Sequence, residues 1–114
     1  MITNEQLAEL VRSQVEEMDR QNEACSQNNK YSQRLKCLTE RLKDANGIRQ
    51  YFKVYQTTEC NAFACPDGSV RVFSALIDIL DDNELLGVIG HEIGHVALRH
   101  SKKAWQDALL RSAA

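Results

Sequence analysis

The sequence predicts an α+β fold in which helices lie on one side of a small sheet. Three observations support this class. Apolar residues recur at helical spacing over residues 1–48, β-branched and aromatic residues cluster between residues 51 and 73, and helical spacing returns from residue 74 onward. The chain therefore reads as one domain, residues 1–114, with a helical segment over 1–48 and a segment of sheet and helix over 49–114.

The first predicted helix runs for about five turns and ends before the polar stretch at residues 21–30. Thr3 marks its start, because Gln6 stands three residues later and completes a capping box. Its apolar stripe consists of Leu7, Leu10, Val11, Val15 and Met18.

The second predicted helix carries a shorter stripe, made of Tyr31, Leu35, Leu38 and Leu42. We expect Asn46 and Gly47 to end it, since glycine tolerates the left-handed backbone that often follows a helix.

Three short strands are predicted next, at residues 51–55, 61–65 and 69–73. The middle and last strands should form a hairpin around the turn Pro66-Asp67-Gly68. In the last strand Val70 and Val72 share one face and Arg71 lies on the other. The result is a small three-stranded sheet.

The rest of the chain is predicted to be helical. Ser74 can cap a short helix that runs to Leu80. Asp81 and Glu84 form a second capping box, which starts a long helix at about residue 82 that continues past Ser101.

Composition and charge exclude several classes of protein. Hydrophobic residues make up 43% and charged residues 26% of the 114 residues, as in soluble globular domains. The net charge of -2 offers no basic excess, so nucleic acid is not an expected partner. No apolar run is long enough for a transmembrane segment, and residues 1–5 lack the features of a signal peptide.

The cysteines are Cys25, Cys37, Cys60 and Cys65. None form a Cys-x-x-Cys pair, which argues against a zinc ribbon or a thioredoxin-type site. Two disulfides and four free thiols both fit these spacings.

The long helix contains the motif His91-Glu92-Ile93-Gly94-His95. Residues four apart lie one turn above each other, so both imidazoles can reach one metal ion. Glu92 can reach a water beside that ion without being a ligand, as in a zinc protease. The alternative is a chance pair of exposed histidines.

The surroundings of the motif favour a metal site over chance. The helix is apolar, so we expect it to be buried. Three interior glycines each cost roughly 1 kcal/mol relative to alanine, and their spacing suggests that another element approaches closely. They are Gly87, Gly90 and Gly94.

A third ligand is not evident in the sequence. His100 lies five residues after His95, on another side of the helix, and is expected to be a polar residue near the helix end. The later carboxylate, Asp107, lies roughly 18 Å further along a continuous helix. The sequence therefore predicts an incomplete metal site.

Four segments together resemble the HtpX-like zinc metalloendopeptidases, metallopeptidase family 48 of the gluzincin clan. They are residues 61–64 (Asn-Ala-Phe-Ala), 68–74 (Gly-Ser-Val-Arg-Val-Phe-Ser), 82–85 (Asp-Asn-Glu-Leu) and 88–96 (Val-Ile-Gly-His-Glu-Ile-Gly-His-Val). The resemblance is dense from residue 51 to residue 103. It implies a zincin-like fold with a long active-site helix.

The resemblance also implies roles for single residues. His91 and His95 correspond to zinc ligands, Glu92 to the general base, and Asn61, Ala62, Phe63 and Ala64 to the edge strand that binds an extended peptide substrate. The family's third ligand lies in a later glutamate-rich helix, so we expect this chain to be a truncated piece that is inactive alone.

For the whole protein, the resemblance implies hydrolysis of unfolded or misfolded envelope proteins in the bacterial periplasm or at the outer membrane, with a lipid anchor. Two alternatives stay open: an inactive zincin-like module that binds a peptide or a partner, and a metal-binding protein without hydrolysis.

Self-association is the last expectation. In the family's fold a later segment packs on the active-site helix, so apolar surface around Ile89, Val96 and Trp105 should be partly uncovered here. We expect a homodimer formed through the helix at residues 82–110 or by exchange of the C-terminal part, unless the N-terminal helices fold over that surface and keep the chain monomeric.

Overall fold

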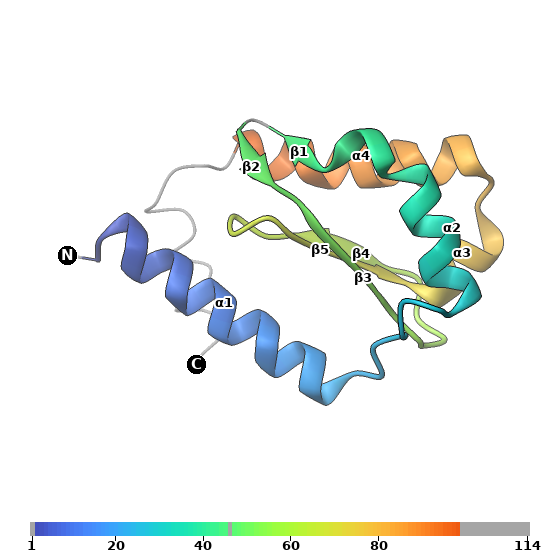
Figure 1. Ribbon diagram of the computed structural model, residues 1–114, viewed down its shortest axis with the longest axis horizontal. Coiled ribbons are helices and arrows are strands. Elements are labelled where there is room, and N and C mark those ends of the chain that lie inside the picture. The colour runs from blue at the N-terminus through green and yellow to red at the C-terminus, as the bar shows by residue number, and fades with distance from the viewer. Residues whose placement is uncertain (1, 46, 99–114) are drawn as a thin grey trace.

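The computed structural model describes residues 2–45 and 47–98. The helices and strands follow one another in the order predicted for an α+β chain (Figure 1). The elements are α1 (Asn4–Gln21), α2 (Lys30–Leu38), the 3-10 helix η1 (Glu40–Leu42), β1 (Asp44–Ala45), β2 (Ile48–Arg49), β3 (Tyr51–Tyr55), β4 (Ala62–Ala64), β5 (Ser69–Phe73), α3 (Ser74–Ile79) and α4 (Asp82–Leu98).

The capping box predicted for the first helix is present. The Thr3 hydroxyl accepts a hydrogen bond from the Gln6 N–H at 3.1 Å, and the Gln6 side chain accepts one from the Thr3 N–H at 2.8 Å. Three residues of the predicted stripe are buried, Leu7, Val11 and Val15, whereas Leu10 is 47% exposed. The helical period therefore located α1 to within a residue and overstated the width of its buried face.

The second helix ends earlier than predicted. It stops at Leu38 and is followed by a turn of 3-10 helix and by a small antiparallel pair in which Ala45 lies opposite Ile48. Gly47 has a φ of +77° in the connection between β1 and β2, so it serves a hairpin and not a helix end. The prediction that Gly47 terminates a helix is therefore wrong, and Asn46, named in the same prediction, lies outside the described residues.

The main sheet has the strand order β3-β5-β4. β4 and β5 form the predicted antiparallel hairpin, and Gly68 occupies its turn with a φ of +94°. The Asp67 carboxylate fixes this turn by accepting hydrogen bonds from the N–H and the hydroxyl of Ser69. β3 runs parallel to β5, and β5 is the central strand.

Helices cover both faces of this sheet (Figure 1). One face carries Val54, Ala62, Ala64, Val70 and Val72, which form one buried cluster with Leu35 of α2, Ile77 of α3, and Leu85, Ile89 and Ile93 of α4. The other face carries Arg71, which contacts Asp19 of α1. The prediction that all helices lie on one side is therefore wrong.

The position of α1 explains why Arg71 is buried. Its guanidinium donates from Nε and Nη2 to the two carboxylate oxygens of Asp19, at 2.9 and 3.1 Å. Nη1 donates to the main-chain oxygens of Tyr51 and Val70. Tyr55 completes the group by donating its hydroxyl hydrogen to Asp19. Every residue of β5 is consequently buried, including the one that sequence alternation places opposite the valines.

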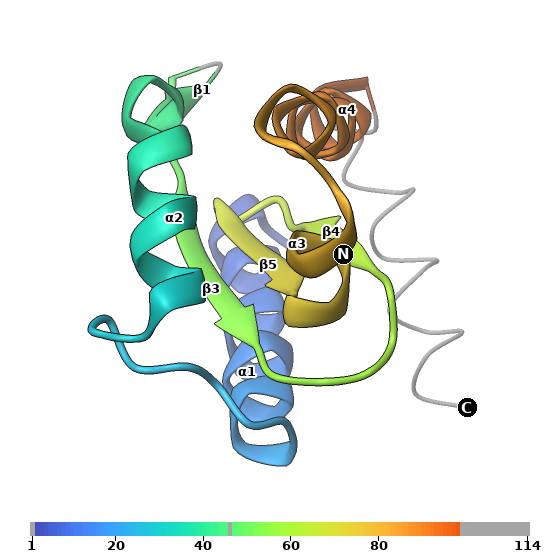
Figure 2. The ribbon, with the colours of Figure 1, turned by 90° about the vertical axis from the view of Figure 1, so that its right-hand side faces the viewer.

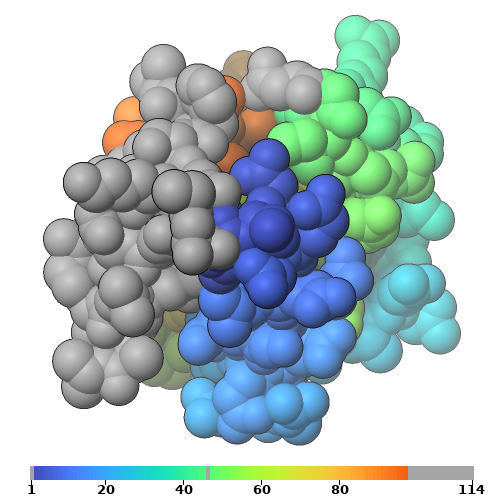
Figure 3. Space-filling view, turned by 90° about the vertical axis from the view of Figure 1, so that its left-hand side faces the viewer, coloured from blue at the N-terminus to red at the C-terminus, as the bar shows by residue number. Residues whose placement is uncertain are grey.

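The N-terminal part of α1 lies beside the segment that contains β2 and the start of β3 (Figure 3).

The prediction that Ser74 caps α3 is wrong. The Ser74 hydroxyl instead hydrogen-bonds the main chain of Thr57. Within the residues that the structure describes, no helix combines the length and the hydropathy needed to cross a membrane.

Candidate metal centre

The helix α4 begins at the predicted capping box. The Asp81 carboxylate accepts from the Glu84 N–H at 2.8 Å, and the Glu84 side chain accepts from the Asp81 N–H at 3.0 Å. Leu85, Ile89 and Ile93 then recur every four residues and are buried against the sheet. This burial sets the rotation of α4 about its own axis.

The rotation places His91 and His95 on the exposed side of α4. They are one helical turn apart, their ring centroids are 4.8 Å apart, and the rings are inclined at 65°. Glu92 follows around the helix and is half-buried. All three lie in one helix. That helix was expected to be buried, and it is buried only on the side of Leu85, Ile89 and Ile93, since both histidines are exposed.

The glycines of α4 lie on open surface. A Cβ built on Gly87, Gly90 or Gly94 would meet no atom of another element within 4 Å. The expected close approach of another segment is therefore absent, as far as residues 2–45 and 47–98 are concerned.

The apolar surface predicted to be partly uncovered involves Ile89, Val96 and Trp105. Ile89 is fully buried in the sheet-facing cluster, and Val96 is half-buried. Trp105, His100 and Asp107 lie outside the described residues, as does any part of the long helix after Leu98.

The donor set fits part of a zinc site. Imidazole nitrogens are suitable zinc ligands, and two of them one turn apart can share one ion. Among the described residues no cluster of three or more His, Cys, Asp or Glu side chains could hold a metal ion. The two histidines therefore account for half of a four-coordinate shell.

The predicted substrate strand lies at one edge of the sheet, directly against α4 (Figure 2). Ala62 and Ala64 pack in the same cluster as Leu85 and Ile89. The Phe73 N–H donates to the Asn61 oxygen at 3.0 Å, so Ala62 and Ala64 direct their main-chain groups away from β5. The Asn61 side chain accepts from the Ala62 N–H at 2.8 Å, and within residues 2–45 and 47–98 the outward main-chain groups of Ala64 have no recorded partner.

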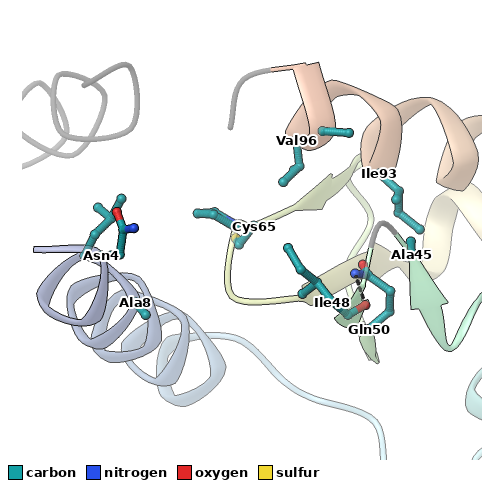
Figure 4. Close-up of a pocket in the computed structure, with 11 residues that line it drawn as sticks. Asn4, Ala8, Ala45, Ile48, Gln50, Cys65, Ile93 and Val96 are labelled. Atoms are coloured by element: carbon teal, nitrogen blue, oxygen red, sulfur yellow. Dashed lines mark hydrogen bonds between the residues drawn. The ribbon is translucent and has the colours of Figure 1, made fainter. Parts of the chain in front are cut away.

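A pocket of about 580 Å³ lies on the other side of α4 (Figure 4). Ile93 and Val96 face it from α4, Ile48 and Gln50 from the β2 region, and Asn4 and Ala8 approach from α1. Because Ile93 belongs to the buried face, this pocket is separate from the histidine pair.

Arg34 fixes the start of α4 and was not singled out by its sequence context. Its guanidinium donates to the carbonyl oxygens of Ile77 and Leu80 at 2.5 and 2.8 Å, and to the Asp82 carboxylate at 2.9 and 3.0 Å. These groups lie 43 to 48 residues away in sequence, so no local pattern marks the contact.

The four cysteines are thiols in this structure. Burial, with a smaller contribution from the Asp67 carboxylate, raises the pKa of Cys65 to about 12. Burial and the nearby Glu23 carboxylate also raise the pKa of Cys25. Both thiols are therefore poor nucleophiles at neutral pH.

Comparison with known proteins identifies relatives over most of the chain. Residues 27–113 match Peptidase family M48. Metalloprotease YcaL of Escherichia coli is 48% identical over 86 residues, which cover 75% of this chain and 34% of that protein. Metalloprotease LoiP of Escherichia coli is 44% identical over 95 residues, which cover 82% of this chain and 38% of that protein.

A more distant relative is the beta-barrel assembly-enhancing protease of Yersinia pestis, 38% identical over 69 residues, or 58% of this chain and 14% of that protein. The matched part of the chain thus spans little more than a third of the length of YcaL and of LoiP.

Proposed function

Since this chain belongs to peptidase family M48, we propose that it supplies the zinc-binding helix and the substrate strand of a metalloendopeptidase. The observation that carries the proposal is the pair His91 and His95, exposed one turn apart on α4 with Glu92 beside them. The relatives named as metalloproteases support the same activity class.

His91 and His95 would hold the ion through their imidazole nitrogens. A bound zinc ion would lower the pKa of a water molecule to about 7 and polarise the peptide carbonyl. The Glu92 carboxylate would take the proton from the attacking water and deliver it to the leaving amine nitrogen. The zincin-like fold implied by the motifs is part of this proposal.

The strand β4 would hold the substrate in extended form. The outward N–H and C=O of Ala64 and the outward C=O of Ala62 can pair with a peptide main chain. Main-chain pairing selects weakly for sequence, which suits unfolded or misfolded protein substrates.

A further ligand must complete the zinc shell, since residues 2–45 and 47–98 offer no third ligand group, and we propose that it comes from outside the 114 residues. The 114-residue chain should then be inactive by itself. In the whole protein we place this activity in the bacterial periplasm or at the outer membrane, with a lipid anchor, and a relative named for β-barrel assembly supports an envelope location.

The test is hydrolysis of unfolded casein by the full-length protein with and without Glu92→Gln. The substitution should abolish hydrolysis and leave zinc bound, because it removes the base and no ligand. Glu9→Gln removes a carboxylate from the exposed side of α1 and is the matched control. Wild-type activity in the Glu92→Gln variant would contradict the mechanism.

The alternative function is a binding module without hydrolysis. The lack of a third ligand group among the described residues favours it. Glu92 argues against it, since a binding module needs no carboxylate beside the ligand pair. A full-length protein that binds casein and zinc but never cleaves would support this alternative.

A further inference from the structure

We propose that the outer edge of β3 is a second binding site, which takes an extended acidic segment of another protein as an added strand. The site is at the opposite edge of the sheet from β4, with β5 between them. It uses none of the residues of the candidate metal centre, so it stands independently of the proposed peptidase function.

The main chain of β3 is unpaired over a short window of its outer edge. The Tyr51 N–H donates to the Gly68 oxygen, so Tyr51, Lys53 and Tyr55 direct their main-chain groups toward β5. Phe52 and Val54 therefore direct theirs outward. Among the described residues, the N–H and C=O of Phe52 have no recorded partner and Phe52 is half-buried, whereas Val54 is completely buried, so Phe52 alone offers main-chain groups to an incoming strand.

Both ends of this window are closed by the chain itself. The Cys25 N–H donates to the Val54 oxygen at 2.8 Å, and the Gln56 N–H donates to the Glu23 oxygen at 2.7 Å. At the other end, the Gln50 N–H donates to the Lys43 oxygen at 2.6 Å. An incoming strand can therefore pair with Phe52 in one register only, and the paired segment must be short.

A groove of about 520 Å³ runs along this window, between α2 and β3. The two elements lie side by side in Figure 2. Ser32, Lys36 and Thr39 contribute to the α2 wall, and Tyr51 and Phe52 to the strand wall. The space accommodates the side chains that a strand directs toward α2.

The charge of the groove selects an acidic occupant. Its lining includes Lys36, Lys43, Arg49 and Lys53, and none of the described residues that line it is Asp or Glu. Lys43 pairs with Glu40 at 2.8 Å and Lys53 with Asp19 at 3.4 Å, both through side chains that are about half exposed. Within the described part of the chain, Lys36 and Arg49 form no ion pair, although Lys36, after Lys43, also acts on the charge of Glu40, and both cations can meet a carboxylate of the occupant.

The main-chain groups distinguish a peptide from other anions. Phe52 offers one donor and one acceptor side by side, which is the pattern that a hydrogen-bonded pair of an antiparallel ladder requires. The phosphates of a nucleic acid backbone supply hydrogen-bond acceptors and no donors, so they cannot donate a hydrogen bond to the Phe52 carbonyl oxygen. The combination of a ladder site and flanking cations therefore favours an acidic strand.

The test uses the 114-residue chain and a blocked eight-residue peptide of alternating Val and Glu, labelled with fluorescein. We expect saturable binding by fluorescence anisotropy. Hydrogen exchange measured by NMR should slow at least fivefold at the amide of Phe52, and remain unchanged at Ala62 and Ala64.

Two controls separate the ladder from the charges. The same peptide with alternate amides N-methylated keeps its carboxylates and should bind at least tenfold more weakly. Lys36→Glu combined with Arg49→Glu should weaken binding by a similar factor, whereas Arg12→Glu combined with Lys30→Glu, which lie outside the groove, should not. Circular dichroism checks that each variant is folded.

Three results would overturn the inference: no saturable binding of the Val-Glu peptide, binding that N-methylation leaves unchanged, or amide protection at Ala64 instead of Phe52. Tighter binding of the corresponding Val-Lys peptide would overturn the assigned charge.

Discussion

The guanidinium of Arg71 and the carboxylate of Asp19 form a two-point ion pair across 52 residues of sequence, with Nε and Nη2 each bonded to a separate oxygen. Arg71 is 4% exposed and the Asp19 side chain 18% exposed. This pair attaches α1 to the face of the sheet opposite α4.

Replacing Asp19 should destabilise the chain strongly. Asp19→Ala leaves a buried guanidinium without its counter-charge, and such losses cost about 3 kcal/mol or more in the free energy of unfolding. Lys53→Met removes the more exposed cation that also contacts Asp19 and should change this free energy by less than about 0.5 kcal/mol. Urea unfolding followed by circular dichroism measures both, and equal effects would contradict the assignment.

The same pair should make stability fall in acid. Burial acts to raise the pKa of Asp19, but hydrogen bonds from Arg71 and Tyr55 and the charge of Arg71 outweigh it and hold that pKa below its ordinary value. The stabilisation is therefore complete above about pH 3.9, the ordinary pKa, and is lost as pH falls through the lower pKa of the folded state. Urea midpoints between pH 2 and pH 6 should drop more steeply for the wild type than for Asp19→Ala, and parallel curves would contradict this.

Arg34→Met should loosen the start of α4. The substitution removes donors from the carbonyl oxygens of Ile77 and Leu80, and we expect a loss of about 1–2 kcal/mol in the free energy of unfolding. The control is Arg20→Met, whose partner Glu17 lies on the exposed surface of α1 and whose loss should leave the urea midpoint unchanged. A midpoint unchanged in both variants would show that Arg34 does not hold this junction.

Two glycines should respond to alanine in opposite directions. A Cβ on Gly68 would lie 1.9 Å from the Arg49 carbonyl oxygen, at a φ of +94°, so Gly68→Ala should cost at least about 2 kcal/mol. Gly87→Ala meets no atom within 4 Å and should raise the free energy of unfolding by up to about 1 kcal/mol, because alanine is the better helix former. Thermal unfolding measures both, and destabilisation by Gly87→Ala would reveal an element packed on the histidine face.

Zinc should bind the 114-residue chain weakly. Two imidazoles supply half of a four-coordinate shell, so metal analysis after dialysis against a chelator should find no zinc. Calorimetry without a chelator should detect weak zinc binding to the wild type and none to His91→Ala. Stoichiometric zinc that survives the chelator would show that a third ligand is supplied within this chain or by a second copy.

The sequence was most informative where one periodic pattern decided the structure. The capping boxes at Thr3 and Asp81 and the strands at 51–55 and 69–73 follow from local residues, and each lies where predicted. Gly47 was misassigned because a glycine with positive φ ends a helix or turns a hairpin equally well. The hairpin could have been recognised from the Asn-Gly dipeptide itself.

Other features depend on distant residues and leave no local signal. Which face of the sheet α1 covers is set by Asp19 meeting Arg71, and the exposure of His91 and His95 is set by how α4 rests on Ala62 and Ala64 of β4. The family match supports the chemistry of the motif, but the roles of His91, Glu92, His95 and the strand at 61–64 stay predictions.

The central position of β5 also sets the order in which this chain can assemble during synthesis. The β4–β5 hairpin closes within a dozen residues, whereas Asp19 leaves the ribosome 52 residues ahead of Arg71. At a synthesis rate of about 5–20 residues per second, α1 waits roughly 3–10 s for its partner. Throughout that interval the apolar stripe of Leu7, Val11 and Val15 has no sheet to rest on, which makes the nascent N-terminal helix a natural client for a chaperone.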